Sequence, residues 1–167
     1  MSKVFNALFL SQRNSARSVL AEALLNHFAE GRFRASSAGV RPADDIEPIV
    51  YELLEHAKVP YVRSKPKHYL DFAREASAPL DFVFTLSDTA AGEPMPEWPG
   101  QPVSAHWRAE DPDRSADRAE RRLSLIRVRA ELERRLRVFL NLPFESLDRM
   151  SLQRQVDAIG EKRRDSL

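Results

Sequence analysis

The chain has 167 residues, with 26 Lys and Arg residues against 25 Asp and Glu residues and a formal net charge of +1. This length fits one domain, and a hydrophobic fraction of 43% supplies a core and excludes an intrinsically disordered chain. No apolar run approaches the roughly 20 residues of a membrane-spanning helix, and the near-neutral charge argues against broad nucleic-acid binding. No cleavage site follows residues 1–3, so we expect no signal peptide, no membrane partner and a cytoplasmic location.

The chain contains no cysteine. Disulfides, thiolate metal sites, a thiol nucleophile and a dithiol redox relay are therefore all excluded. We also predict no resident metal and no cofactor. The composition thus restricts the chemistry before any motif is considered.

The first half of the chain predicts strands and helices in alternation, from apolar runs and from apolar positions three and four residues apart. In chain order they are a buried strand at residues 4–10, a helix with apolar positions from Val19 to Phe28 and a break at Gly31, a strand at residues 33–38, a helix from Ile46 to Ala57 and a short helix at residues 69–76. The polar residues 11–15 join the first strand to the first helix.

The second half predicts two more strands and two more helices. In chain order they are a strand at residues 81–86, a Pro- and Gly-rich loop at residues 92–101, a short strand at residues 103–105, a long helix with an apolar stripe from Leu125 to Leu140, and a last helix whose Leu152, Val156 and Ile159 face inward. Asp117 and Glu120 form a capping box before the long helix, and Gly160 is expected to end the last one. We expect residues 162–164 to be solvated.

Strands that alternate with helices, and that are apolar throughout, predict a parallel sheet covered by helices. The expected fold class is α/β, in a three-layer α/β/α arrangement around a four-stranded parallel sheet. We expect a single domain over residues 1–167, with a core at about residues 4–142 and a C-terminal helical extension at residues 143–167. Ligands of such sheets bind at the carboxyl ends of strands, beside helix N-termini, so the first strand–loop–helix junction is the candidate site.

The residues at this junction have the chemistry of an anion site. The first backbone N–H groups of a helix have no partner within it, and the helix dipole adds partial positive charge there. Arg17 adds a guanidinium suited to tetrahedral oxyanions, and Asn14 tolerates the left-handed backbone that curls a loop around an anion. An ordinary capped helix with a surface arginine explains the loop equally well. The predicted anion-binding residues are Ser11, Gln12, Arg13, Asn14, Ser15, Ala16, Arg17 and Ser18.

This loop resembles the phosphate-binding loop, Cys-x5-Arg-Ser, of the low-molecular-weight protein tyrosine phosphatases and their arsenate-reductase relatives. Ser11 occupies the cysteine position, and Arg17-Ser18 matches Arg-Ser. Other segments that resemble these proteins are Ser37-Ala38-Gly39, Arg63-Ser64-Lys65, residues 82–88, Trp98-Pro99-Gly100, His106-Trp107 and Asp111-Pro112. The resemblance spans roughly residues 4–160 and implies the fold of phosphotyrosine protein phosphatase I.

The departures from the family pattern concern its reactive groups. In the family the loop cysteine is the nucleophile, and thioredoxin-coupled relatives pass a disulfide through cysteines at positions that resemble Ser87 and Met95. A serine hydroxyl is a much weaker nucleophile than a thiolate unless a base activates it. We expect the histidines to be structural or solvated; they are His27, His56, His68 and His106. Thiol-based reductase chemistry is excluded, and the scattered changes favour a naturally degenerated member, a pseudoenzyme.

The role of general acid is implied only by the resemblance. Asp111 matches the family's general acid, with Asp113 as the alternative, although the local sequence also fits a solvated carboxylate. Ser11, Arg17 and Asp111 are thus the candidate catalytic positions, with Asp111 vestigial if no nucleophile is present.

Some relatives hold a monovalent cation at positions that resemble Asn14, Glu22 and Ser37. Either the Lys65 ammonium takes the place of that ion and pairs with Glu22, or Lys65 is a solvated loop lysine.

Three functions remain open. The first is a binding protein that holds phosphate, sulfate, arsenate or a phosphorylated protein without turnover. The second is a weak phosphohydrolase that uses Ser11, or Asp111 with a water. The third is a structural or interaction protein whose pocket is spoiled by Arg13, which replaces a glycine of the family loop. We expect the first, because a serine in place of the cysteine keeps the shape of the site and removes its chemistry. The oligomeric state does not follow from the sequence.

Overall fold

The computed structural model describes residues 3–112 and 117–161. A four-stranded parallel sheet with the order β2-β1-β3-β4 lies at its centre. The strands are β1 (Phe5–Ser11), β2 (Phe33–Gly39), β3 (Phe82–Thr85) and β4 (Val103–His106). The helices are α1 (Arg17–Phe28), α2 (Pro48–His56), the 3-10 helix η1 (Tyr69–Phe72), α3 (Asp88–Ala91), α4 (Arg118–Leu140) and α5 (Arg149–Glu161). The predicted α/β fold with a four-stranded parallel sheet is confirmed.

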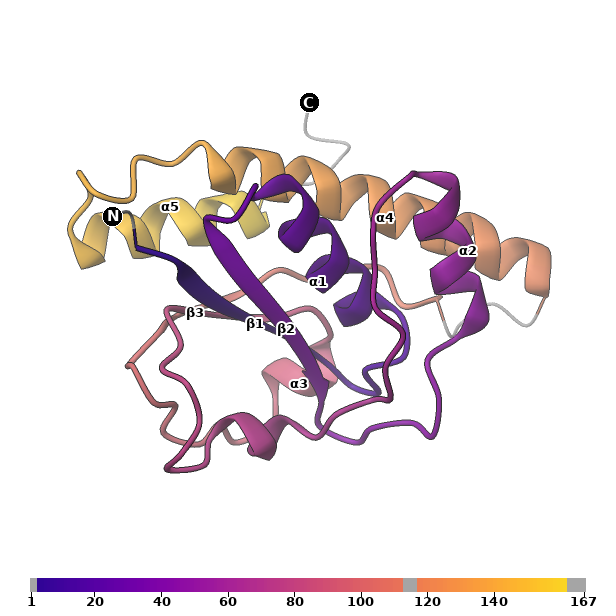
Figure 1. Cartoon of the computed structure of the whole chain (residues 1–167), viewed down its shortest axis with the longest axis horizontal. Helices are drawn as coiled ribbons and strands as arrows, with labels where there is room; N and C mark the ends of the chain where they lie inside the picture. Colours follow the sequence, from indigo (N-terminus) through magenta and orange to yellow (C-terminus); the bar gives the residue numbers. More distant parts are fainter. Residues whose placement is uncertain (1–2, 113–116, 162–167) are drawn as a thin grey trace.

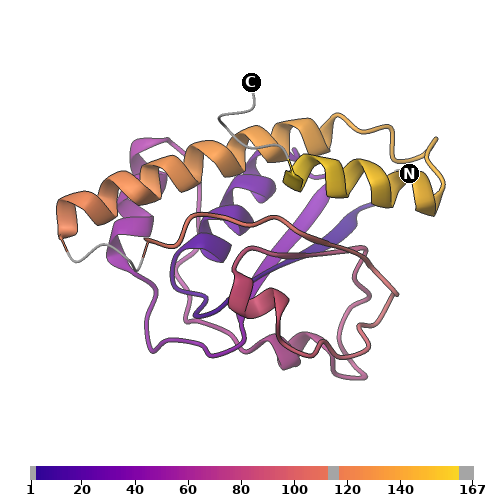
Figure 2. The same ribbon diagram turned by 180° about the vertical axis from the view of Figure 1, so that it is seen from behind.

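Two layers of unequal thickness cover the sheet. Figures 1 and 2 show the long helices α1, α4 and α5 on one face, with α2 beside α1 and α4, whereas the opposite face carries η1, α3 and loops. Alternate residues of β1 serve the two layers: Ala7 and Phe9 pack under the long helices, and Leu8 and Leu10 pack under Tyr69 and neighbouring side chains. Because successive strand residues face opposite sides, a strand covered on both faces is apolar throughout.

Aromatic rings fill the thicker layer. Phe139 of α4 is completely buried. Its ring contacts five others, with centroids 5.0–5.7 Å away; they belong to Phe33, Phe82, Phe84, Trp107 and Phe144. These rings come from the two strands β2 and β3 and from the segments that follow β4 and α4, so one side chain of α4 joins the sheet to the helical layer.

Gly160, the residue predicted to end the last helix, lies inside α5, which continues to Glu161. A Cβ atom at position 160 would lie 2.5 Å from Cδ1 of Trp107 and 2.8 Å from the carbonyl oxygen of His106. The glycine therefore allows α5 to approach the segment that follows β4, and the Trp107 indole Nε1 donates a hydrogen bond to the Val156 carbonyl at 3.0 Å. The sequence indicated this glycine only as a helix end, and the structure adds its role in close packing.

The other differences concern short elements. The helix expected at residues 69–76 is the single 3-10 turn η1, and α3 appears where no helix was expected. Residues 113 and 162–164, named above, lie outside the described residues. No helix that the structure describes is both long enough and apolar enough to span a membrane.

Candidate functional site

The loop between β1 and α1, residues 11–17, curls with its carbonyl groups outward; this loop is the cradle. The carbonyls of Ser11, Gln12, Arg13 and Ser15 accept hydrogen bonds from the backbone N–H groups of Val40, Arg41, Ala43 and Glu47, at 3.2, 2.8, 2.9 and 3.0 Å. Every peptide bond in the described chain is trans, so the N–H group that follows each of these carbonyls points to the opposite side, the interior of the loop. The N–H groups of residues 12, 13, 14 and 16 thus point away from residues 40–47, and that of Asn14 donates to Ser11 Oγ at 3.2 Å.

Asn14 fixes this curvature from within. Its φ of 52° is the left-handed conformation considered from the sequence. Its side-chain Nδ2 donates to Ser18 Oγ and Ser37 Oγ, both at 2.9 Å, and its Oδ1 accepts from the backbone N–H of Lys67 at 2.8 Å. One buried side chain therefore ties the loop to α1, to β2 and to the segment before η1.

The end of β2 passes against the back of the cradle at Gly39. A Cβ atom there would lie 2.9 Å from the carbonyl carbon of Arg13 and 2.9 Å from the backbone nitrogen of Asn14. Glycine is thus needed at position 39 for close approach. Arg13 itself is not among the positive-φ residues of the described chain, so it introduces no left-handed strain into the loop.

The side chain of Ser11, which lines the cradle, forms hydrogen bonds only with neutral groups among the described residues. Its buried Oγ lies 2.7 Å from Ser18 Oγ and accepts the N–H of Asn14. Neither a hydroxyl nor an amide can act as the base that a serine nucleophile needs.

Arg17 and Asp111 meet at the mouth of the cradle. Nη1 of the buried Arg17 donates to the carbonyl of Ala109 at 3.4 Å, and its Nη2 lies 4.0 Å from Asp111 Oδ1. The cavity of the cradle holds only about 10 Å³ and is lined by Ser11, Arg13, Ser15, Ala16, Arg17, Glu47 and Pro112. That volume suffices for about one water molecule.

A second, larger cavity of about 1000 Å³, the cleft, lies beside the cradle and shares Arg17 with it. It lies between residues 106–111, the start of α3, the middle of α4 and the end of α5, and its walls include Asp88, His106, Arg108, Glu110, Arg127 and Arg135. It therefore occupies the carboxyl end of the sheet, where ligands of parallel sheets bind.

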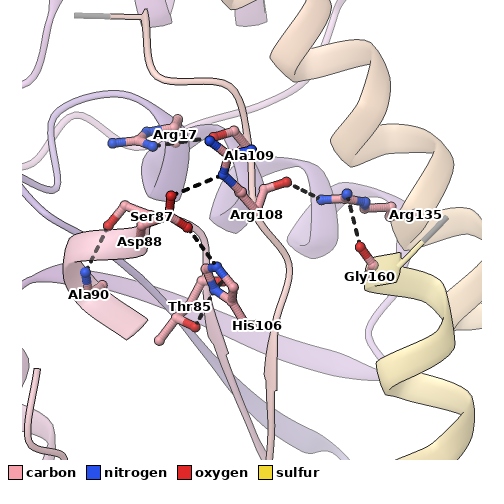
Figure 3. A network of polar contacts seen from close by, with 10 residues as sticks. All are labelled: Arg17, Thr85, Ser87, Asp88, Ala90, His106, Arg108, Ala109, Arg135 and Gly160. Atoms are coloured by element: carbon pink, nitrogen blue, oxygen red, sulfur yellow. Dashed lines mark hydrogen bonds and ion pairs between the residues drawn. The ribbon is translucent and has the colours of Figure 1, made fainter. Parts of the chain in front are cut away.

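A polar network runs along one wall of the cleft (Figure 3). His106 Nδ1 lies 2.8 Å from Thr85 Oγ1 and 3.0 Å from the Thr85 carbonyl, and its Nε2 lies 3.1 Å from Asp88 Oδ1. Arg108 Nε donates to the other oxygen of Asp88 at 3.1 Å. Hydrogen bonding to His106, and then the charge of Arg108, holds the pKa of the Asp88 carboxyl below its usual value. His106 thus belongs to a network that its sequence neighbours alone did not indicate.

Arg135 joins the network from α4. Its side chain is 4% exposed. Nη1 donates to the carbonyl of Arg108 at 2.9 Å, and Nη2 donates to that of Gly160 at 3.3 Å and lies 2.7 Å from Glu131. Burial lowers the pKa of Arg135, and the charge of Glu131 opposes this effect. The sequence contains one signal that could have indicated this buried side chain: an arginine beside the apolar positions that form the stripe of the long helix.

The profile described as Low molecular weight phosphotyrosine protein phosphatase matches residues 6–156 of the chain. The chain belongs to this family. The family expected from the resemblance is therefore confirmed, with Ser11 in place of the loop cysteine.

Several relatives are named as arsenate reductases. The glutaredoxin arsenate reductase of Synechocystis sp. is 25% identical over 114 residues, which cover 64% of this chain and 77% of that protein. The thioredoxin-dependent arsenate reductase of Corynebacterium glutamicum is 31% identical with a TM-score of 0.61, over 81% of this chain and 60% of that one. The arsenate reductase of Archaeoglobus fulgidus is 28% identical with a TM-score of 0.62, over 81% of this chain and 99% of that one. The chain thus spans less than two thirds of the Corynebacterium protein.

Ser87 and Met95 occupy the two positions that resemble redox cysteines of relatives. The first has a structural role and the second lies at the surface. Ser87 is buried and its Oγ accepts the N–H of Ala90 at 3.1 Å, so it caps the N-terminus of α3. Met95 is exposed in the loop that follows α3. Neither side chain can exchange a disulfide.

The proposed pairing of Lys65 with Glu22 is wrong. Lys65 is 78% exposed and forms an ion pair with Asp45. Glu22 instead accepts a hydrogen bond from Ser37 Oγ at 3.0 Å. Burial raises the pKa of the Glu22 carboxyl, and the charge of Lys67 and the Ser37 hydrogen bonds oppose that rise. The lysine that acts on Glu22 is thus Lys67, whose backbone also holds Asn14.

Glu22 should make the stability of the protein depend on pH. Its folded-state pKa lies above its ordinary value of 4.5, so the folded chain keeps a proton that the unfolded chain releases. The extra proton stabilises the folded state. This contribution to the free energy of unfolding is complete below pH 4.5 and is lost as the pH rises through the raised pKa of Glu22. We expect Glu22→Gln to flatten the fall in unfolding free energy over that window, measured by urea denaturation. Equal slopes in wild type and Glu22→Gln would contradict this, and the exposed Glu97→Gln is the control.

Across residues 3–112 and 117–161, no group of three or more His, Asp or Glu side chains is arranged to hold a metal ion.

Proposed function

We propose that the protein binds a tetrahedral oxyanion in the cradle, either free phosphate, arsenate or sulfate or the phosphoryl group of a larger partner, and that it performs no thiol chemistry on it. The observation that carries this proposal is the outward direction of four loop carbonyls, which turns the following N–H groups to the inside of the loop, where Arg17 lines the same cavity. Backbone amides at a helix N-terminus and a guanidinium are the donors that oxyanions prefer. Relatives named as arsenate reductases support the same ligand class.

An oxyanion can enter only if the mouth of the cradle opens, because a cavity of about 10 Å³ is too small for it. The Asp111 carboxylate, 4.0 Å from Arg17 Nη2, competes with the anion for the same cation. The proposal therefore includes a movement of the segment at Asp111 and Pro112 away from Arg17 when the anion binds.

Titration calorimetry with phosphate, sulfate and arsenate tests the proposal. We expect Arg17→Ala to lose about 1.5–3 kcal/mol of binding free energy, or about 10- to 100-fold in affinity, because a charge-assisted hydrogen-bonding partner is removed. Arg34→Ala is the matched control, since Arg34 is exposed on β2. No binding of any of the three ions to the wild type at millimolar concentration would reject the proposal and favour a structural role.

A second candidate is a weak phosphohydrolase in which Asp111 acts with a water. The distance of 4.0 Å from Asp111 to Arg17 favours it, because that carboxylate lies beside the guanidinium that the cradle and the cleft share. A sensitive assay with an aryl phosphate separates the two candidates: turnover that disappears in Asp111→Asn supports hydrolysis, and binding without turnover supports the first proposal.

A further inference from the structure

The cleft is far larger than an inorganic oxyanion requires. Its volume of about 1000 Å³ lies at the upper end of the range for small-molecule pockets. The cradle and the cleft meet at Arg17, and consecutive residues of one segment, Asp111 and Pro112, line the cleft and the cradle respectively. A molecule with its oxyanion at Arg17 would therefore have the rest of its atoms in the cleft.

The walls of the cleft carry carboxylates and guanidinium groups, so they favour a ligand with both positive and negative groups. The largest apolar side chain that lines it is Ala109, and its one ring is the imidazole of His106. Arg127 holds Glu110 through two hydrogen bonds, of 3.2 and 3.0 Å, and both side chains are half-exposed to the cleft. An aryl group would find no aromatic or aliphatic partner there, whereas a ligand with ammonium and carboxylate groups would find a carboxylate and a guanidinium side by side.

One buried donor in the cleft lacks an acceptor. Nε of Arg135 is buried and has no hydrogen-bond partner in the described part of the chain, although Nη1 and Nη2 of the same side chain are paired. Because this nitrogen has almost no accessible surface, it is closed to a ligand in the cleft, and Arg135 acts through its paired Nη1 and Nη2. Figure 3 shows Arg135 and Arg17 on the two sides of one segment, where they donate to the consecutive carbonyls of Arg108 and Ala109. The guanidinium groups of Arg17 and Arg135 thus hold this wall of the cleft from its two sides.

We propose that the cleft binds the organic part of a small zwitterionic organophosphate, with the oxyanion at Arg17, the carboxylate at Arg127 and the ammonium at Glu110. This inference rests on the proposed oxyanion binding and names the class of its ligand. A phosphoryl group carried on a peptide shares the oxyanion but lacks the two adjacent charges.

Calorimetry with four probes tests the inference: inorganic phosphate, O-phosphoserine, N-acetyl-O-phosphoserine amide and phenyl phosphate. We expect O-phosphoserine to bind the wild type about tenfold or more tightly than each of the other three, because two further charged groups are paired. The ratio of the O-phosphoserine affinity to the phosphate affinity should fall toward one in Arg127→Gln and in Glu110→Gln. It should not change in Arg122→Gln, because Arg122 lies on the same helix but faces Glu52.

The outcomes separate the two proposals. If phosphate binds but O-phosphoserine binds no more tightly, or if the affinity ratio survives in both cleft variants, the zwitterion proposal is wrong and oxyanion binding stands. A preference for the capped phosphoserine or for phenyl phosphate also overturns it, in favour of a peptide or an aryl ligand. If none of the four probes binds, both proposals fail.

Discussion

The wild-type protein is expected to reduce no arsenate with thioredoxin, glutaredoxin or small thiols, and to hydrolyse aryl phosphates no faster than the buffer. Arsenate reduction through a disulfide needs thiols, and the chain has none. Phosphoryl transfer needs an activated nucleophile, and the described partners of Ser11 Oγ are a hydroxyl and an amide. Coupled reductase assays and p-nitrophenyl phosphate hydrolysis measure both activities.

Ser11→Cys is the informative variant for this prediction. A sulfur at position 11 would lie beside the N–H group of Asn14, which favours a thiolate, so aryl phosphate hydrolysis should rise above the wild-type rate. Arsenate reduction should stay absent in Ser11→Cys, and it should require cysteines at positions 87 and 95 as well. Ser11→Ala is the control: robust wild-type turnover that this substitution abolishes would show that Ser11 is a nucleophile.

Phe139→Ala should lower the free energy of unfolding by about 3–5 kcal/mol, because a fully buried ring is removed and its cavity is only partly refilled. The site cannot collapse easily, since the five rings around Phe139 come from two strands and from the segments that follow β4 and α4, each fixed by its own contacts. Denaturant unfolding followed by circular dichroism measures the loss.

Val138→Ala provides the matched control, because Val138 precedes Phe139 on the same helix and is 47% exposed. Its effect should stay within about 0.5 kcal/mol, as for surface substitutions in general. A loss of less than about 1 kcal/mol in Phe139→Ala would contradict the importance of this aromatic cluster.

The features that the sequence predicted well are those that depend on residues next to one another in the chain. The apolar run of β1 and the polar loop that follows it predicted a buried parallel strand and the candidate site at its carboxyl end, because a strand buried on both faces is apolar throughout. Short elements were predicted less well. Four residues, Asp88–Ala91, give no helical period, and α3 depends on the cap that Ser87 supplies.

Errors at the candidate site came from contacts between distant residues. Lys65 and Lys67 are equally plausible partners for Glu22 in the sequence, and only the backbone contact of Lys67 with Asn14 distinguishes them. Gly160 near a helix end fits both a helix stop and a close approach, and the deciding neighbour is Trp107. Arg135 is buried because its guanidinium meets carbonyls of two other segments, which local periodicity does not reveal.

The central place of β1 in the sheet has a consequence for the order of folding. β1 pairs with β2 across a single helix, Ala7 with Ala35, whereas its pairing with β3, Ala7 with Phe82, closes a much longer loop. Because closing a longer loop costs more entropy, the unit of β1, α1 and β2 is favoured to assemble first. That unit contains every residue of the cradle together with Ser37 and Gly39, while the cleft waits for β3, β4 and α4. A chain emerging from the ribosome would thus possess the residues of its anion cradle, and with residues 40–67 the contacts that shape it, before it possesses the cavity beside it.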